Sequence, residues 1–183
     1  MNTPNRHPHG PLTKLHASAD IPLFHPLMGL PELYLAGIDY WVCPKCGESR
    51  ALIPALDLLP RAIARALVTK LTALSGVEIE FLRNALDLKS NEFAKILCVT
   101  PQHFSRWENS RSVPSPPTDR LIRLSYVFLS GDEKLNSLLS QRFAEWSASI
   151  RPFRQPTRIL AEYDGVEPWI VRLLSDLPRA KAA

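Results

Sequence analysis

Two short amphipathic segments follow each other between residues 88 and 109, in the sequence LKSNEFAKILCVTPQHFSRWEN. The first begins at Ser90, a favourable N-cap residue. Its apolar residues recur at helical spacing, at Phe93, Ala94 and Leu97. The second begins at Thr100, which can accept from free backbone N–H groups, and Pro101 suits the first helical position because it has no N–H to leave unpaired. The spacing therefore predicts a helix-turn-helix.

The second helix of this motif is expected to bury Phe104 and Trp107, which lie three residues apart, and to expose the residues between and before them. If its start enters the major groove of DNA, Gln102 and His103 meet the base edges first and Arg106 follows one turn later. Glutamine suits the edge of adenine, and arginine suits the edge of guanine. The residues expected to contact phosphates are Ser90, Thr100, Ser105, Asn109 and Arg111.

Structural roles are the alternative for three residues of the motif. Ser90 could serve only as a helix cap, and His103 could simply be solvated. Glu108 is expected either to orient Arg106 or to tie the helices together. We expect the main base contacts from Gln102 and Arg106.

Further helices are expected on both sides of the motif. Apolar residues recur every three or four positions between 56 and 74, which predicts a helix with one buried face, formed by Leu56, Leu59, Ile63, Leu67, Leu71 and Leu74. Ser75 and Glu78 have the form of a capping box at the start of the segment EIEFLRNAL. Thr118 can cap a helix that ends at Gly131, because the prolines before it interrupt any earlier helix. The expected fold class is therefore mainly α, with five helices around one small core.

The chain outside these helices is expected to be less regular. Residues 1–31 are rich in proline and histidine and show little periodicity, so a loose arm is expected there. Residues 33–42 favour a β-strand and 49–53 a returning strand, with the turn CPKCG between them. Beyond a helix expected over 133–146, RPFRQPTR is expected to be a linker, and WIVRLL a short helix or a strand.

The segment ALDLKSNEFAKILCVTPQHFSRWENSRSVPSPPTDRLIRL resembles the DNA-binding domain of phage-repressor-like (Xre family) regulators. The stretch YLAGIDYWVCPKCGESRALIPAL, followed by a helix and LSGVEIEFLRNALDL, looks like YgiT-type proteins, which join a zinc finger to a helix-turn-helix and include the MqsA antitoxins. The resemblance covers about residues 24 to 128. It implies base contacts from Gln102 and Arg106 and a role as an antitoxin.

Two residues depart from the pattern of that family. Cys98 stands in the turn where the family usually has glycine, and Ser110 replaces the glycine that usually ends the second helix. The turn at Cys98 is therefore expected to be strained or differently shaped, and neither departure is expected to abolish the motif. The Cys98 side chain is expected to be a buried thiol.

The metal content of CPKCG has two interpretations. A tetrahedral zinc site needs four ligands, and Cys43 and Cys46 supply two. The YgiT-type proteins carry a second C-x-x-C upstream, whereas the upstream candidates here are His7, His9, His16 and His25. Either zinc is held by the two cysteines with histidines or a second subunit, or the hairpin is a metal-free remnant packed by Tyr34, Tyr40 and Trp41. An incomplete site loses binding energy, which favours the remnant.

Composition narrows the class of protein. The 183 residues, 45 % of them hydrophobic, can form a substantial core, and no apolar run is long enough to span a membrane. We therefore expect a soluble cytoplasmic protein. The net charge of +4 permits binding to a polyanion without a basic tail, so a homodimer that doubles the DNA contacts is expected. No catalytic triad, carboxylate pair or complete metal site indicates an enzyme.

The expected domains are an arm and β-hairpin over 1–54, a connecting helix over 55–75, a DNA-binding domain over 76–130 and a helical extension over 131–183. The expected function is a sequence-specific transcriptional regulator that binds double-stranded DNA, as an antitoxin-like autorepressor of a toxin-antitoxin operon. The alternative is a protein-interaction module that neutralises a toxin or enzyme through its N-terminal part. No cofactor is expected with certainty; zinc is the possible one.

Overall fold

The computed structural model describes residues 6–149, 157–166 and 169–174. The helices are α1 (Leu59–Thr69), α2 (Gly76–Asn84), α3 (Ser90–Ile96), α4 (Pro101–Glu108), α5 (Pro116–Ser130) and α6 (Glu133–Ser149). The strands are β1 (Arg6–His7), β2 (Gly10–Pro11), β3 (Thr13–Ala17), β4 (Leu23–Phe24), β5 (Leu33–Ala36), β6 (Ile38–Val42), β7 (Ser49–Ala51), β8 (Arg158–Glu162) and β9 (Ile170–Leu174).

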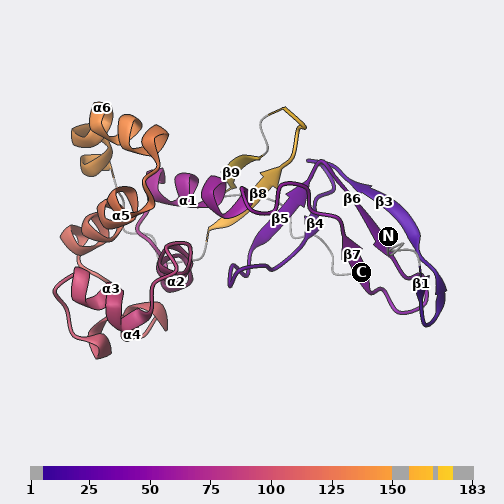
Figure 1. Cartoon of the computed structure of the whole chain (residues 1–183), viewed down its shortest axis with the longest axis horizontal. Helices are drawn as coiled ribbons and strands as arrows, with labels where there is room; N and C mark the ends of the chain where they lie inside the picture. The colour runs from indigo at the N-terminus through magenta and orange to yellow at the C-terminus, as the bar shows by residue number, and fades with distance from the viewer. Residues whose placement is uncertain (1–5, 150–156, 167–168, 175–183) are drawn as a thin grey trace.

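The strands form two multi-stranded sheets, so the expected mainly α fold class with five helices is wrong. One sheet has the order β3-β6-β7 and the other the order β4-β5-β8-β9, while β1 and β2 form a separate small hairpin. The helices lie at one end of an elongated molecule, the three-stranded sheet lies at the other, and the four-stranded sheet lies between them (Figure 1). The fold thus combines two sheets with a group of helices.

The four-stranded sheet depends on a pairing between distant parts of the chain. β5 and β8 are parallel, with Leu33 opposite Ile159 and Ala36 opposite Glu162. β8 then pairs with β9 in antiparallel register. The expected helical extension is therefore helical only through α6, and WIVRLL contributes a strand. Of the expected linker RPFRQPTR, residues 151–156 lie outside the described residues, and Arg158 already belongs to β8.

Gly37 separates the two sheets, although β5 and β6 are consecutive in the chain. Its φ is 70°, a backbone conformation that side chains disfavour. A Cβ atom at this position would lie 2.0 Å from the carbonyl oxygen of Tyr163. The Gly37 N–H donates to the carbonyl of Ala17 at 2.7 Å. Glycine is therefore required where the chain passes from one sheet to the other.

The N-terminal segment is more ordered than a loose arm. β3 pairs with β6 over five residue pairs, from Thr13 opposite Val42 to Ala17 opposite Ile38. β7 pairs with β6 on its other side, so the expected hairpin around CPKCG is present. Periodicity did not indicate β3, because four of its five residues are exposed and only Ala17 is buried. Its stability comes from backbone hydrogen bonds rather than from an apolar face.

The helices differ in detail from the expected boundaries. α1 spans fewer residues than the apolar periodicity, and Leu56 and Leu71 are 46 % and 55 % exposed. α5 begins at Pro116 rather than after Thr118, with Ser115 as its N-cap, because prolines at the first two helical positions leave no N–H unpaired. Gly131 ends α5 at a φ of 63°, as expected. No helix in the described part of the chain has the length and apolarity needed to cross a membrane.

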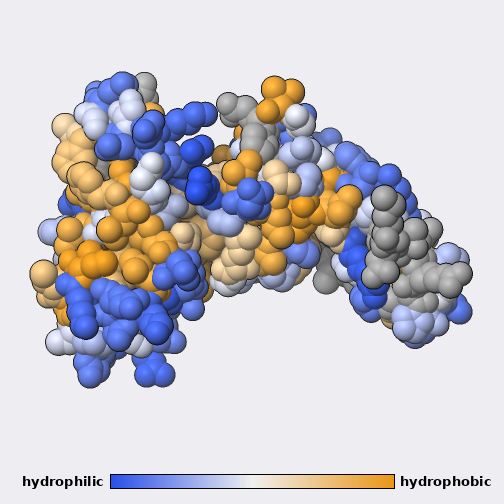
Figure 2. Space-filling model, viewed as in Figure 1, coloured by the Kyte–Doolittle hydropathy of each residue, from blue (hydrophilic) through white to orange (hydrophobic). Residues whose placement is uncertain are grey.

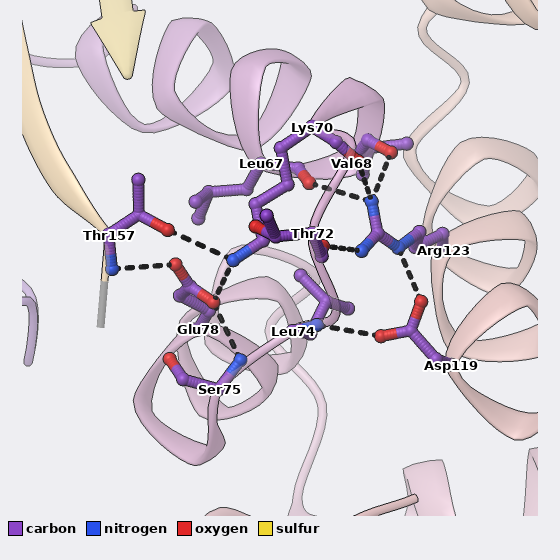
Figure 3. A network of polar contacts seen from close by, with 10 residues as sticks. All are labelled: Leu67, Val68, Lys70, Thr72, Leu74, Ser75, Glu78, Asp119, Arg123 and Thr157. Atoms are coloured by element: carbon purple, nitrogen blue, oxygen red, sulfur yellow. Dashed lines mark hydrogen bonds and ion pairs between the residues drawn. The ribbon is translucent and has the colours of Figure 1, made fainter. Parts of the chain in front are cut away.

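A buried polar network joins the helices to the sheet (Figure 3). Lys70 donates to Glu78 at 2.6 Å and to Thr157, just before β8, at 3.0 Å. The fully buried Arg123 of α5 pairs with Asp119 at 2.8 Å. Its other guanidinium nitrogens donate to the backbone carbonyls of Leu67, Val68, Lys70 and Thr72. The network therefore caps the end of α1 and fixes it against α2, α5 and β8.

One apolar core continues through both parts of the molecule. It includes Leu33 and Leu35 of β5, Ile63 of α1 and Phe104 of α4. Trp169 belongs to it, because the ring is 6 % exposed and its Nε1 donates to the carbonyl of Ala55 at 3.1 Å. The helices are thus held by the same core as the sheet, which gives the α3–α4 pair a rigid support.

Candidate nucleic-acid interface

α3 and α4 occupy the two segments that were expected to be helical, and the turn between them is tight. Cys98 has a φ of 55°, and its N–H donates to the carbonyl of Lys95 at 3.0 Å. Phe93 and Phe104 meet edge to face with ring centroids 5.5 Å apart, and Phe104 meets Trp107 at 5.9 Å. The inner sides of both helices are therefore packed, as their spacing predicted.

Glu108 ties α2, α3 and α4 together. Its carboxylate accepts from Arg83 Nε at 2.6 Å and from Ser90 Oγ at 2.9 Å. The N-cap of α3 is Lys89 rather than Ser90, and the Lys89 N–H donates to the carboxylate of Glu92 at 2.8 Å. Of the two expected roles of Glu108, orienting Arg106 and tying the helices, the structure therefore shows the second.

An open groove of about 620 Å³ runs along the exposed side of α3 and α4. Its lining residues are Ser90, Asn91, Pro101, Gln102, Ser105, Arg106, Asn109 and Arg111. The structure thus brings together most of the residues expected to contact DNA. Asn91 was not among them, and its signal in the sequence was its place next to Ser90 at the start of α3.

Three side chains of the groove are free to bind a ligand. Gln102, Arg106 and Arg111 are exposed, and within the described residues their side chains make no hydrogen bond or ion pair with the rest of the protein. Gln102 and Arg106 are four residues apart, so they project from the same face of α4. The groove therefore offers an amide and two guanidinium groups to solvent.

The remaining expected contact residues already have partners. Thr100 caps α4 by accepting from the His103 N–H at 3.2 Å. Asn109 Nδ2 donates to the carbonyl of Ser105 at 2.8 Å and lies 3.2 Å from its hydroxyl. The His103 ring packs against Trp107 with centroids 4.7 Å apart. Ser105 and Asn109 line the groove, whereas Thr100 and His103 are not among its lining residues.

The two cysteines of CPKCG lie at the far end of the molecule from this groove. Cys43 is buried and Cys46 is exposed, and His9 of the β1–β2 hairpin lies beside them. The third cysteine, Cys98, is exposed in the turn before α4, so the expectation of a buried thiol is wrong. The left-handed backbone at Cys98 directs the side chain away from the packed faces of α3 and α4.

The Cys43 thiol has a perturbed acidity. Burial acts to raise its pKa, but hydrogen bonds from the backbone of Cys46 and Lys45, and from the side chains of Cys46 and His9, lower the pKa to about 6. A thiolate is the form that binds metal ions. The turn therefore favours the charged form of one candidate ligand.

Comparisons with known proteins give no assignment. The chain matches no protein-family model, no curated protein and no solved structure. The function of the groove must therefore be inferred from its own residues and geometry.

Proposed function

We propose that the protein is a sequence-specific DNA-binding regulator in which α4 enters the major groove. The observation that carries the proposal is the pair Gln102 and Arg106. Both are exposed, have no side-chain partner among the described residues, and lie on one face of a helix whose opposite face is packed. An amide and a guanidinium group one turn apart match the paired donors and acceptors of adenine and guanine edges. Such base contacts are usually made by polar side chains that project from a helix lying in the major groove.

The surroundings of α4 support contacts to the DNA backbone. Arg111 follows the helix at the same groove and carries a positive charge that no described residue pairs, which suits a phosphate. Ser90 is engaged with Glu108, so we assign it a structural role instead. Thr100 and Ser105 are exposed and accept hydrogen bonds through their hydroxyl oxygens, so their O–H groups can donate to phosphate oxygens. The Asn109 amide nitrogen is engaged with Ser105.

A homodimer would double these contacts and read two half-sites. Apolar side chains on the outer face of α5 support this part of the proposal: Leu121, Phe128 and Leu129 are 43 %, 75 % and 49 % exposed. In Figure 2 apolar surface lies in the region of α5, above the hydrophilic surface of α3 and α4. A second copy seated there would leave α4 of each copy uncovered.

The narrower proposal of an antitoxin-like autorepressor rests on the resemblance to YgiT-type proteins. It requires that the protein bind the DNA upstream of its own coding sequence and that a toxin be encoded beside it. If the N-terminal part instead binds the protein encoded by the neighbouring gene, and promoter DNA is not bound, the result would support the interaction-module alternative.

Replacement of Arg106 tests the role of α4. Arg106→Ala should weaken binding to the specific promoter fragment by about 1 to 3 kcal/mol and relax the preference at one base pair, because one guanine contact is lost. The melting temperature should stay unchanged, since Arg106 has no partner among the described residues. Fluorescence anisotropy with a panel of single-base variants of the fragment measures both effects.

Two further variants serve as controls. Arg111→Ala should weaken binding to all sequences alike and reduce the slope of log affinity against log salt by about one. Arg61→Ala removes an exposed charge from α1, on another side of the molecule, and should change neither quantity. Unaltered promoter binding by Arg106→Ala, or unfolding of that variant, would show that α4 does not read DNA as proposed.

A further inference from the structure

Three side chains with affinity for metal ions converge where two tight turns meet. His9 comes from the turn between β1 and β2, and Cys43 and Cys46 come from the turn between β6 and β7. Their ligand atoms all lie within 4.8 Å of one another, and Cys43 Sγ lies 3.9 Å from His9 Nδ1. We propose that these three residues bind one zinc ion.

The spacing of the three atoms suits a tetrahedral ion. Zinc bound to sulfur at about 2.3 Å and to nitrogen at about 2.0 Å keeps its ligand atoms roughly 3.5 to 3.8 Å apart. The separation of Cys43 Sγ and His9 Nδ1 is close to that value, so a small rotation of the side chains completes the arrangement.

The backbone around the cysteines forms a metal-binding type of turn. The Gly47 N–H donates to the carbonyl of Cys43 at 2.9 Å, and the Cys43 N–H donates to the carbonyl of Glu48 at 2.9 Å. Gly47 adopts a φ of 73°, which lets the chain reverse directly after Cys46. The turn therefore holds both sulfur atoms on one side, next to the β1–β2 hairpin.

The chemistry of the three ligands selects zinc. Two thiolates and one imidazole are soft and borderline donors, which bind zinc in preference to magnesium or calcium. The argument for a metal-free remnant was that the sequence supplies only two ligands. In the structure His9 raises the number to three and leaves one position of a tetrahedral ion for a further ligand.

Bound zinc would fix a weak part of the fold. β1 and β2 have two residues each and form a sheet of their own, which is too small to be stable alone. The ion would connect this hairpin to the β6–β7 turn, 34 residues further along the chain. The site is independent of the α4 groove, so the proposal can fail while DNA binding stands, and the reverse.

Metal analysis of the full-length protein, purified without chelators, tests the proposal. We expect about one zinc ion per chain by mass spectrometry of the dissolved metal. The cobalt-substituted protein should show the strong sulfur-to-metal absorption of a thiolate site. Cys43→Ser, Cys46→Ser and His9→Ala should each lower the zinc affinity by roughly 100-fold or more, because each removes a direct ligand.

Two matched variants control for general effects of the substitutions. His16→Ala changes a histidine of the neighbouring strand β3 whose Nδ1 lies 2.8 Å from Asp39, and Cys98→Ser changes an exposed cysteine outside the turn. Both should keep the full zinc content. Because Cys43 is buried, its variant could fail to fold; His9 and Cys46 are exposed, so their variants decide in that case.

Two results would overturn the proposal. One is a wild-type protein that neither contains zinc nor takes it up from a buffered zinc solution. The other is a folded His9→Ala or Cys46→Ser variant that binds zinc as tightly as the wild type does.

Discussion

Cys98 and Ser110 hold the left-handed backbone conformation on either side of α4. Their φ angles are 55° and 56°. A side chain in this conformation clashes with its own backbone, at a cost of about 1 to 2 kcal/mol that glycine avoids. The chain therefore carries local strain at both ends of the helix that we propose reads DNA. The sequence indicated the strain at Cys98, whereas at Ser110 it showed only that the usual glycine is replaced.

Glycine at these positions should stabilise the protein. We expect Cys98→Gly and Ser110→Gly each to raise the free energy of unfolding by about 0.5 to 1 kcal/mol, because the relief of strain exceeds the extra entropy of glycine in the unfolded chain. Urea denaturation followed by circular dichroism measures the change.

Ser105→Gly is the control for this prediction, since Ser105 lies inside α4 with helical backbone. It should lower the stability by roughly 1 kcal/mol. Equal losses in all three variants would mean that the left-handed positions are not strained.

The candidate site was predicted in part from single residues. Gln102 and Arg106 followed from the spacing of Phe104 and Trp107, which is a local pattern. The hydrogen bond between Ser90 and Glu108 could not be predicted, because Glu108 lies on another helix. The sequence was compatible both with Glu108 orienting Arg106 and with Glu108 tying the helices together. Ligand side chains can be placed on a helix face from periodicity, whereas contacts between helices need the fold.

At the scale of elements, Glu108 links α4 to α2 and α3. Its side chain and that of Arg83 are 9 % and 11 % exposed. Removing the carboxylate would leave the Arg83 Nε–H and the Ser90 hydroxyl without the acceptor that they share. Arg83 keeps its bonds to Asn84 and to the carbonyl of Leu88. Leaving a buried donor without its acceptor costs more free energy than the ion pair itself contributes to stability.

We therefore expect Glu108→Ala to lower the free energy of unfolding by about 2 to 4 kcal/mol. Glu80→Ala is the matched control, because Glu80 also faces Arg83, at 3.9 Å, but is 48 % exposed. That variant should lose less than about 0.5 kcal/mol. Chemical denaturation of both variants measures the difference. Similar small losses of stability in both would show that Glu108 does not stabilise the contact between the helices.

Helices were predicted better than strands, for a physical reason. Caps and prolines act within one turn of the chain, so Thr100 with Pro101 and Gly131 marked helix ends directly. β3 and β8 are held by hydrogen bonds to strands elsewhere, and β8 lies more than a hundred residues from its partner β5. No local pattern encodes such a pairing, and the expected fold class was wrong for that reason.

At the scale of the whole molecule, the buried network of Figure 3 joins the helices to the sheet. Burial acts to raise the pKa of Glu78, but Lys70 and the N–H of Ser75, among others, lower it below its ordinary value of 4.5. A carboxyl group whose pKa is lower in the folded state stabilises the protein above its unfolded pKa. That contribution disappears as the pH falls through the folded pKa.

The free energy of unfolding should therefore decrease as the pH falls below about 4.5. A double variant, Lys70→Met with Glu78→Gln, should lose less stability than the wild type over the same range, because neither side chain titrates. Urea denaturation between pH 7 and pH 3 provides the comparison. Parallel curves for the two proteins would show that Glu78 does not contribute to acid sensitivity.

The parallel pairing of β5 with β8 also affects the order in which parts of the chain can fold during synthesis. In a chain emerging from the ribosome, α3 and α4 can fold well before residues 158–174 have been synthesised. β5 cannot pair with β8 until then. Until then the apolar residues of β5 have no cover from β8 and β9. A nascent or prematurely ended chain could thus already have a folded α4 while its sheet is open to proteases and chaperones.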